Sequence, residues 1–459
     1  MTIDAQHPLP GSRALVVGAA RSGLSAARLL RRHGLDVRVC DARDAAALPD
    51  AARTLDELGA EARLGSEAPA LLDGRDLVVW SPGVAIAHPL ATAARSAGIP
   101  VISELELGFL AAHAPLVGVT GTNGKSTTTD LTGTLLRAAG REVEVCGNIG
   151  RPICDVAESV SARGLLVVEV SSFQLETVGR LKPFVAVWLN LTPDHLDRHG
   201  DFDTYGAMKQ RLFARQDDGD YAVWNADDPE VMARRSGNGT PLEFSARGVV
   251  AQGAGIEGGT ITLTWRGGEE RLMPASELGI PGAHNRMNAL AALAATLPWE
   301  IAPAKLRETL RGYRGLEHRL ETVATVDGVT FVNDSKATNT GSLEVALQSF
   351  DDPVVLIAGG RDKGQDFGPL AELVRHSTRA VVLIGEGADA MARAWRGAQL
   401  SRASSLAEAV DLAFAAARPR GTVLLSPGCA SFDMFHDYED RGRRFKAEVA
   451  RIQMKEAHA

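Results

Sequence analysis

The chain has 459 residues, enough for roughly three domains at about 150 residues each. Its 49 basic and 57 acidic residues give a formal charge of −8, which speaks against nucleic acid as a partner. No apolar run approaches the roughly 18 residues of a membrane span, and the N-terminal residues lack the apolar core of a secretion signal. We therefore expect a soluble cytoplasmic protein without a membrane partner.

Cysteine usage agrees with that compartment. Cys40, Cys146, Cys154 and Cys429 show no CxxC spacing, and nothing in the sequence places them in a secreted protein. Closely spaced pairs would indicate a metal site or a redox motif, and a secreted chain would favour disulfides. We expect four free thiols.

Short apolar runs alternate with helical stretches over the first hundred residues, which is the pattern of strand–helix–strand units. A helix is predicted over residues 19–34, where it stops at a glycine. The strands are predicted at residues 14–18, 36–41, 76–83 and 99–103.

Two loops of this first block could hold a phosphate. The loop from Gly18 to Gly23 resembles a dinucleotide-binding fingerprint with alanine in place of the middle glycine, so NAD is one candidate ligand. A nucleotide phosphate at a helix N-terminus needs only a tight turn and free backbone N–H groups. Ser81–Gly83 follows directly after a strand and is a second loop of this kind.

A second block begins near residue 115. Strands are predicted at residues 115–120, 164–172, 184–195 and 221–225, with helices at 125–140 and 282–296. Residues 242–248 and 260–267 alternate between apolar and polar side chains, and we predict them to be antiparallel strands.

A third block starts near Gly315. Apolar strands at residues 329–335, 353–360, 380–385 and 422–428 are separated by helical stretches such as 370–377 and 405–417. Such continuous apolar strands indicate parallel sheets covered by helices on both faces, so the predicted fold class is α/β. Ligands of these sheets bind beyond the carboxyl ends of the strands.

The clearest chemical signal lies between the first strand and the first helix of the second block. "VTGTNGKST" places Gly121 and Gly124 in a tight loop, Lys125 within reach of nucleotide phosphates, and the Ser126 hydroxyl where it can bind Mg²⁺. Val119 stands where the usual phosphate-binding loop has its first glycine. We predict a variant phosphate-binding loop.

Two later strand ends supply further metal ligands. Glu169 ends an apolar strand, where enzymes with a phosphate-binding loop hold an acidic Mg²⁺ ligand. His195 follows another strand and is the candidate for a second metal site, with Asp194 and Asp197 as rivals.

Seven motifs occur in a fixed order along the last three-quarters of the chain: "TGTNGKST", "EVSSFQLE", "NLTPDHLDRH", "HNRMNALAA", "LEHR", "NDSKATN" and "SPGCASFDMF". Together they resemble the Mur ligase family, whose glycine loop reads TGTNGK[ST], so that Val119 is expected. The resemblance implies three α/β domains. They are a Rossmann-like UDP-substrate domain at 1–103, a central ATP- and Mg²⁺-binding domain at 104–315, and a Rossmann-like amino-acid domain at 316–459.

The resemblance also implies a reaction. The combination of "NDSKATN" with "SPGCASFDMF" points to an ATP-dependent ligase that adds D-glutamate to UDP-N-acetylmuramoyl-L-alanine through an acyl phosphate, in peptidoglycan precursor synthesis. Its cofactors would be ATP and Mg²⁺ at two sites, with Mn²⁺ as an alternative ion, and we expect a monomer. Closure of the third domain would complete the site and exclude water.

The resemblance implies roles for individual residues of the ATP and metal sites. Lys125, Glu169, His195 and Lys209 would be catalytic, and Lys209 would be carbamylated. The metal ligands would be Ser126, Glu169, His195 and the modified Lys209. The ATP site would comprise Gly121, Thr122, Asn123, Gly124, Lys125, Ser126, Thr127, Asn285, Asn288, Arg319 and Asp334, the last on the ribose.

The two other substrates would occupy separate sets of residues. The UDP substrate would contact Arg21, Ser22, Arg43, Ser81, Gly83 and Asn148; Arg21 and Ala42 depart from the family's pairing at the uracil. The glutamate would contact Lys336, Thr338, Lys363, Ser431 and Tyr438, where two lysines match two carboxylates. Tyr438 stands where the family often has phenylalanine.

Other functions stay open at this point. One is another Mur-type amino-acid ligase, adding L-glutamate or acting like a folylpolyglutamate synthase; the "DNPR" signature of the diaminopimelate- or lysine-adding relative is absent. A nicotinamide-dependent oxidoreductase would use Gly18–Gly23 but would leave Lys125 and Glu169 without a role. A nucleotide-binding module without catalysis is the third alternative.

Overall fold

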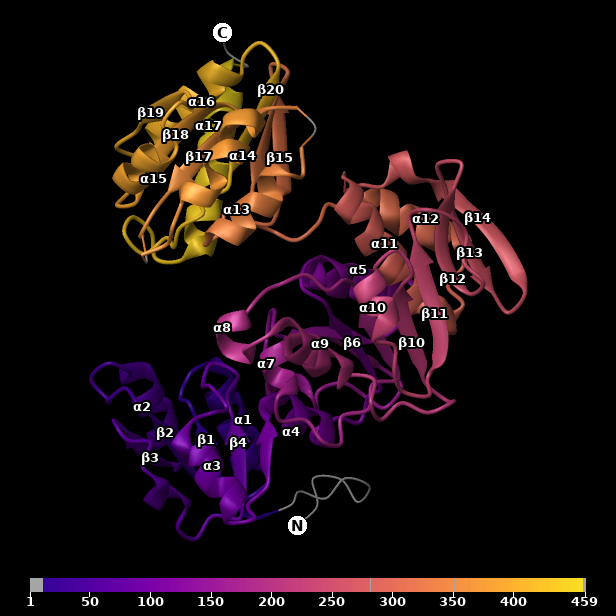
Figure 1. The fold of residues 1–459 in the computed structure, drawn as a ribbon, viewed down its shortest axis with the longest axis vertical. Helices are drawn as coiled ribbons and strands as arrows, with labels where there is room; N and C mark the ends of the chain where they lie inside the picture. Colours follow the sequence, from indigo (N-terminus) through magenta and orange to yellow (C-terminus); the bar gives the residue numbers. More distant parts are fainter. Residues whose placement is uncertain (1–10, 281, 351, 363, 457–459) are drawn as a thin grey trace. The chain divides into compact units, whose positions relative to one another are not determined.

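The computed structural model describes residues 11–280, 282–350, 352–362 and 364–456, without the side chain of Asp197. These residues divide into two compact units: unit 1 comprises Met1–Leu278 and Asn285–Gly312, and unit 2 comprises Gly279–His284 and Tyr313–Ala459. Within the described residues, no helix is long and apolar enough to cross a membrane. Each unit is described separately below (Figure 1).

The first sheet of unit 1 is built from five parallel strands in the described part of the chain. Its strands, in spatial order, are β3 (Glu61–Leu64), β2 (Asp36–Asp41), β1 (Arg13–Val17), β4 (Leu77–Trp80) and β5 (Val101–Ser103). The accompanying helices are α1 (Arg21–Arg32), α2 (Pro49–Glu57), η1 (Pro69–Leu72), α3 (Pro89–Ser96) and α4 (Glu104–Ala111).

Alternation along the central strand explains why this sheet is covered on both faces. Successive side chains of a strand point to opposite sides. Ala14 and Val16 are buried in one apolar cluster with residues of α1, whereas Leu15 and Val17 are buried in another with residues of α3. The four apolar residues that follow Arg13 in β1 therefore pack against helices on both faces of the sheet, as the sequence predicts for this block.

The second sheet, also in unit 1, contains nine strands within the described residues. In spatial order they are β14 (Gly268–Pro274), β13 (Thr260–Trp265), β12 (Gly253–Glu257), β11 (Thr240–Ser245), β10 (Tyr221–Asn225), β9 (Val185–Trp188), β6 (Leu116–Thr120), β8 (Leu165–Glu169) and β7 (Val143–Gly147). Strand β6 pairs in parallel with both β8 and β9, which brings three strand ends to one edge.

The antiparallel prediction for this sheet is half right. Strand β13 pairs antiparallel with both β12 and β14, as predicted. Strand β11 pairs in parallel with both β10 and β12, so the antiparallel prediction for residues 242–248 is wrong. Alternation of side chains reports that one face is buried and does not report the direction of the neighbouring strand.

The remaining helices of unit 1 surround this second sheet or connect its strands. They are α5 (Lys125–Ala138), α6 (Ile153–Val156), α7 (Ser172–Leu175), α8 (Leu196–His199), α9 (Phe202–Gln210), α10 (Pro229–Ala233), η2 (Ala275–Glu277), α11 (Ala283–Thr296), η3 (Leu297–Trp299) and α12 (Pro303–Gly312). The first residues of α11, up to His284, are grouped with unit 2.

Unit 2 holds the third sheet, with six strands among the described residues. In spatial order they are β15 (Glu321–Val326), β16 (Val329–Asn333), β20 (Gly421–Leu425), β17 (Val354–Gly359), β18 (Thr378–Ile384) and β19 (Leu400–Arg402). The helices are α13 (Thr340–Leu347), η4 (Gly368–Leu370), α14 (Ala371–Ser377), α15 (Ala388–Ala394), α16 (Leu406–Ala417) and α17 (Tyr438–Glu456). The antiparallel edge strand β15 was not predicted; the parallel α/β core was, and it is confirmed.

The cysteine prediction is also confirmed. All four cysteines are free and buried. Burial raises the pKa of the Cys40 and Cys429 thiols to about 12, so both stay protonated at neutral pH. Buried thiols of this kind pack as small apolar side chains and react slowly.

A buried carboxylate fixes the helix that follows the first sheet. Glu106 of α4 is 1% exposed. Its two oxygens accept hydrogen bonds from the backbone N–H groups of Gly179, Arg180 and Leu181, at 3.0, 2.7 and 3.1 Å. The carboxylate thus satisfies donors of a segment more than 70 positions away in the chain and ties α4 to the loop before β9.

We predict that Glu106→Ala lowers the free energy of unfolding of unit 1 by about 3–5 kcal/mol, because buried N–H groups left without an acceptor cost about 1–3 kcal/mol each. Urea unfolding of the full chain measures this. Glu57→Ala, on the exposed side of α2, should stay within about 0.5 kcal/mol of the parent. Equal stabilities for the two variants would contradict the anchoring role of Glu106.

Candidate active site

The phosphate-binding loop follows β6 and begins α5, as the sequence predicts. Gly124 is the N-cap of α5 with φ +82°, a conformation that a residue with a Cβ adopts only with strain. A Cβ at Gly124 would also collide with the Asn288 side chain. The glycine therefore serves both the turn and the close approach of α11, and the N-terminus of a 14-residue helix faces the loop.

Asn190 clamps this loop from the end of β9. Its Oδ1 accepts from the backbone N–H groups of Thr122 and Asn123 at 3.0 and 2.8 Å, and its Nδ2 donates to the Asn123 carbonyl at 3.1 Å. The N–H groups of residues 122 and 123 are thereby used within the protein. The N-terminus of α5, which begins at Lys125, lies directly after this loop and carries the positive end of the helix dipole.

Two asparagines of α11 lie beside the same loop. The Asn288 side chain accepts from the Thr128 hydroxyl at 3.4 Å and donates to Asn285 Oδ1 at 3.2 Å. Asn288 is 6% exposed, and Asn285 is half-buried. The structure thus brings both predicted ATP residues of this helix to α5.

A buried carboxylate ends the neighbouring strand β8. Glu169 is 2% exposed, and its Oε1 accepts from Asn148 Nδ2 at 2.6 Å. Its Oε2 is buried and has no hydrogen-bond partner among the described residues. Strand β8 packs against α5, the helix that carries the buried residue Ser126. Carboxylate and hydroxyl oxygens are the ligands that Mg²⁺ prefers. The residues fit a hard divalent cation.

Lys209 of α9 is buried beside the phosphate-binding loop. It is 1% exposed, and its ammonium donates to the Gly121 carbonyl at 2.8 Å and lies 4.5 Å from the centre of the Tyr205 ring. The Lys125 ammonium donates to the same carbonyl at 2.9 Å. Burial first, and the positive charge of Lys125 second, hold the pKa of Lys209 well below its usual range, against the opposing pull of Asp194 and Glu169.

His195 lies at the start of α8 in a left-handed conformation, with φ +53°. Its side chain is 47% exposed, and its Nε2 is 3.5 Å from an oxygen of Asp194. The ring packs on Phe173 at 4.8 Å and on Tyr205 at 6.3 Å between centroids. His195 and Asp194 therefore share one turn, and the Asp197 side chain lies outside the described part of the structure.

The predicted UDP-substrate loops meet at the carboxyl ends of β1, β2 and β4. The Ser81 hydroxyl donates to the Gly18 carbonyl at 3.3 Å. Asp41 accepts from the Ala19 and Arg43 backbone N–H groups and from the Arg43 guanidinium, all at 2.9–3.0 Å. Burial opposes ionisation of Asp41, but these hydrogen bonds prevail and lower its pKa to about 2.

The remaining residues of that set are arranged around these loops. Arg21 is exposed and donates to the Gly150 carbonyl, two residues after Asn148. Ser22 is half-buried in the first turn of α1, and Gly83 is exposed with open space around its Cα. The Arg43 side chain is 55% exposed, so its guanidinium can pair with Asp41 and still face solvent.

In unit 2, a tight turn carries Arg319, one of the residues predicted for the ATP site. His318 and Leu320, on either side of Arg319, have φ of +65° and +44°. The His318 carbonyl accepts from Lys336 N at 3.0 Å, and Leu320 N donates to an oxygen of Asp334 at 3.2 Å. The turn is thereby fastened to the segment that follows β16.

Asp334 is 5% exposed, and its other oxygen accepts from the Ser426 hydroxyl at 2.8 Å. Burial raises its pKa to about 7, against the opposing effects of Ser426 and Arg319. Thr338 lies half-buried beyond it and Ser431 is 2% exposed. The carboxyl ends of the paired strands β16 and β20 thus carry Asp334 and Ser426 side by side.

Tyr438 begins α17, and its carbonyl accepts from the Ser335 hydroxyl at 2.8 Å. Its ring lies edge-on to His318 at 6.3 Å between centroids. Lys363 lies outside the described residues. The structure therefore brings Arg319, Asp334, Lys336 and Tyr438 to one end of the third sheet.

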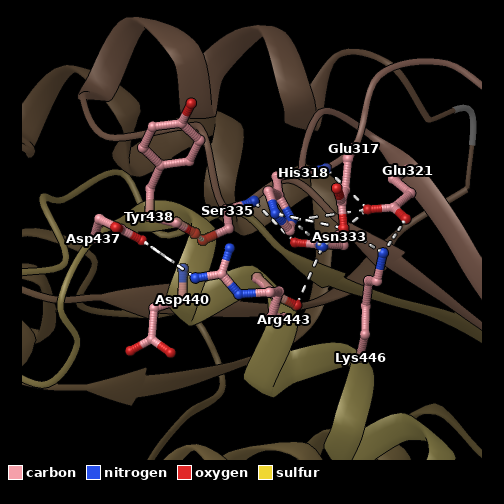
Figure 2. A network of polar contacts seen from close by, with 11 residues as sticks. Glu317, His318, Glu321, Asn333, Ser335, Asp437, Tyr438, Asp440, Arg443 and Lys446 are labelled. Carbon is pink, nitrogen blue, oxygen red and sulfur yellow. Dashed lines mark hydrogen bonds and ion pairs between the residues drawn. The ribbon is translucent and has the colours of Figure 1, made fainter.

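Glu317, His318 and Glu321 form a group that could hold a metal ion. The Lys446 ammonium already bridges the two carboxylates, at 2.8 Å to each, as Figure 2 shows. A lysine in this position supplies the positive charge that a cation would bring. We assign no metal to this group.

Several residues of the site were not predicted from the sequence. Asn190 and Tyr205 were missed, although the Tyr205 hydroxyl lies 3.2 Å from the Thr122 hydroxyl. Asp41, which holds Arg43, was not named as a site residue either. The available signal was a polar residue directly after an apolar strand, which applies to Asn190 and Asp41 but not to Tyr205.

Family models match three consecutive parts of the chain. The Mur ligase MurD-like, N-terminal domain matches residues 12–103, and the Mur ligase middle domain matches residues 119–296. The Mur ligase, glutamate ligase domain matches residues 318–429. Together these matches extend over most of the sequence.

Curated relatives match nearly the whole chain. A UDP-N-acetylmuramoylalanine–D-glutamate ligase of Pelotomaculum thermopropionicum is 44% identical over 441 residues, covering 95% of this chain and 97% of that protein. Ligases of the same name from Salinibacter ruber and Myxococcus xanthus are each 45% identical over 451 residues. They cover 95% and 96% of this chain and 97% and 98% of those proteins.

Solved structures agree on the fold. A pseudomurein peptide ligase type C from Methanothermus fervidus has a TM-score of 0.57 at 19% identity, covering 96% of this chain and all of that one. UDP-N-acetylmuramate-alanine ligase MurC from Thermotoga maritima has a TM-score of 0.57 at 20% identity, covering 96% and 99%. At these identities the likeness concerns the fold alone.

We predict that Asp41→Asn lowers the free energy of unfolding at pH 7 by about 2 kcal/mol, because the carboxylate is favoured in the folded state. Since the folded pKa is depressed, this stability is fully present above the unfolded value near 4. It is lost as the pH falls toward 2. Urea unfolding at several pH values measures the difference, with Asp73→Asn, an exposed aspartate, as control. A difference that stays constant between pH 7 and pH 2 would contradict the assignment.

Proposed function

Because the chain belongs to the Mur ligase family, we propose that it is the ATP-dependent ligase that adds D-glutamate to UDP-N-acetylmuramoyl-L-alanine in peptidoglycan precursor synthesis. The observation that carries the proposal is identity of 44–45% over at least 95% of the chain to ligases named for this reaction. The site supports it, because a phosphate-binding loop, a buried carboxylate and a buried lysine meet at the ends of adjacent elements of unit 1.

The reaction joins a carboxylate to an amine. A carboxylate oxygen of the muramoyl substrate attacks the γ-phosphorus of ATP, and ADP leaves. The amine of D-glutamate then attacks the acyl carbon, the C–O bond to phosphate breaks, and the amide forms with release of phosphate and a proton. No protein nucleophile is needed, so catalysis consists of positioning and of stabilising negative charge.

Mg²⁺ is the metal of the proposed reaction, and when bound it would neutralise charge on the phosphates. Ser126 and Glu169 are the ligands we assign to a first ion, because the Glu169 oxygen without a partner is an available donor. His195 and Lys209 are assigned to a second ion, with Asp194 beside His195. Lys125, at the start of α5, holds the β- and γ-phosphates together with the helix N-terminus.

We propose that Lys209 is carbamylated, and its burial beside Lys125 supports this. A buried ammonium next to Lys125 favours loss of its proton, and the neutral amine is the form that attacks the carbon of CO₂. The N–C bond that forms yields a carbamate, and one proton is released. A side chain that was a second cation becomes an anion, which suits a metal ligand beside Glu169.

The other substrates would occupy the loops described above. We assign the UDP end to Arg21, Ser22, Arg43, Ser81, Gly83 and Asn148, and the glutamate to Lys336, Thr338, Lys363, Ser431 and Tyr438. The α-carboxylate and side-chain carboxylate of glutamate match two lysines. We assign Asn285 and Asn288 to ATP, and likewise Arg319 and Asp334. The active species is a monomer.

We predict that the purified protein releases phosphate only when ATP, Mg²⁺, the muramoyl nucleotide and D-glutamate are all present. The amino acid is needed because inorganic phosphate leaves the acyl phosphate only when the amine attacks the acyl carbon. A coupled phosphate assay, with each component left out in turn, makes the measurement. L-glutamate serves as the matched control, since it carries the same charges with the opposite stereochemistry.

Two outcomes of that assay would overturn the proposal. Full turnover without an amino acid would identify a simple ATPase. Equal use of L-glutamate, or use of a different amino acid in place of D-glutamate, would identify another amino-acid ligase of the family.

We predict that Lys209→Ala lowers turnover at least about 100-fold, because a charged ligand and positioning group is lost. Formate or acetate should partly restore it by placing a carboxylate where the carbamate stood. Lys182→Ala, a surface lysine of the same unit that pairs with Asp217, is the control and should keep full activity. Turnover of Lys209→Ala equal to that of the parent would show that this lysine is not a catalytic residue.

A further inference from the structure

Arg198 is a half-buried arginine that the proposed chemistry does not use. It lies in the single turn of α8, three residues after His195, and its side chain is 14% exposed. Its guanidinium binds both oxygens of Glu176, at 2.9 and 2.6 Å, and the Glu176 side chain is 6% exposed. A bidentate pair with so little solvent access holds the guanidinium in one orientation.

The same guanidinium also donates a hydrogen bond to the loop that follows β4 of the first sheet. Arg198 Nη2 donates to the Val84 carbonyl at 3.0 Å, across 114 positions of the chain. The Trp80 indole N–H donates to the same carbonyl at 2.8 Å. One backbone oxygen thus accepts from β4 and from α8 at once.

Val84 closes the turn that contains Ser81 and Gly83. Val84 N donates to the Ser81 carbonyl at 3.1 Å, and the Ser81 hydroxyl in turn donates to the Gly18 carbonyl at 3.3 Å. Fixing the Val84 carbonyl therefore fixes the two loops that we assign to the diphosphate of the UDP substrate.

The other side of the guanidinium lies close to the turn that contains Asp194 and His195, which we call the metal turn because we assign His195 to a metal ion. Its Cζ lies 4.3 Å from the centre of the Phe173 ring, and the His195 ring packs on the same phenylalanine at 4.8 Å. Both Arg198 N and His199 N donate to the His195 carbonyl at 3.1 Å. Movement of Arg198 would thus disturb the backbone that presents His195.

We propose that Arg198 is a positioning residue that sets the UDP-substrate loops against the metal turn, through Glu176 on one side and the Val84 carbonyl on the other. This role rests on the proposed function, because it concerns where the muramoyl carboxylate is held relative to the phosphate-binding loop. The guanidinium of Arg198 is used within the protein, by Glu176 and by the Val84 carbonyl. A small displacement of the substrate loops costs rate and affinity because the carboxylate must approach the γ-phosphorus in line.

The test is Arg198→Lys in the full chain. A lysine keeps a positive charge beside Glu176 but has one terminal nitrogen, so it cannot pair with the carboxylate and also hold the Val84 carbonyl in the same geometry. We expect the Kd for UDP-N-acetylmuramoyl-L-alanine, measured by calorimetry without ATP, to rise about tenfold, the loss of one charge-assisted hydrogen bond. The Kd for ATP should stay within about twofold of the parent.

Two further variants keep the test independent of folding and charge. Arg198→Gln with Glu176→Gln removes the ion pair as a pair and should show the same selective loss for the UDP substrate. Trp80→Phe removes the other donor to the Val84 carbonyl and should weaken the same Kd. Arg211→Lys is the matched control: this half-buried arginine donates to the Glu176 and Val178 carbonyls and does not reach the substrate loops.

Hydrogen exchange gives a readout that does not depend on any ligand. The backbone amides of Ser81, Gly83 and Val84 should exchange at least about fivefold faster in Arg198→Lys and not in Arg211→Lys, because the Val84 carbonyl loses a fixed partner. Unchanged exchange, or equal weakening of ATP and UDP-substrate binding, would overturn the positioning role. Absence of UDP-substrate binding by the parent would instead overturn the proposed function, and the positioning role with it.

Discussion

Two lysine ammonium groups share one carbonyl oxygen, that of Gly121 at the head of the phosphate-binding loop. Lys125 and Lys209 donate to it at 2.9 and 2.8 Å. Two like charges this close, one of them fully buried, are unfavourable unless anions join them or one charge is removed. The phosphates of ATP supply the first remedy and loss of the Lys209 proton supplies the second. Close to these lysines, Glu169 carries a buried carboxylate oxygen without a hydrogen-bond partner, which a bound cation would stabilise.

Much of the surrounding scaffold follows from the sequence. The strands β1, β6 and β8 are short runs without charged residues apart from Arg13 at the start of β1 and Glu169 at the end of β8, and glycines after β1 and β6 permit the tight turns that start α1 and α5. The positions of Glu169 and His195 beyond strand ends could be predicted, because polar residues that follow buried strands lie at one edge of a parallel sheet, and their metal roles stay predictions. The burial of Lys209 could not be predicted from its own pattern, because a lysine in a nine-residue helix has the pattern of a solvated residue until the helix is packed.

Contacts across long sequence distances account for what the sequence does not reveal. Asn190 meets residue 123 across 67 positions, and Arg198 meets Val84 across 114. Neither contact leaves a periodic signal, since each depends on which strand ends and turns become neighbours. The direction of β11 was mispredicted for a related reason, because its parallel pairing is set by its neighbours in the sheet rather than by its own alternation.

The residues proposed for ATP are drawn from both compact units, and those proposed for the amino acid belong to unit 2, so the proposed reaction requires both units. The central claim is that the phosphoryl group passes to the substrate carboxylate before the amide forms. Its most direct test starts from muramoyl nucleotide labelled with ¹⁸O in that carboxylate, with mass spectrometry of the phosphate released in the presence of D-glutamate. The account predicts one ¹⁸O atom in each phosphate, because the bridging oxygen leaves with phosphorus. Phosphate that carries no label, and instead takes its new oxygen from water, would contradict it.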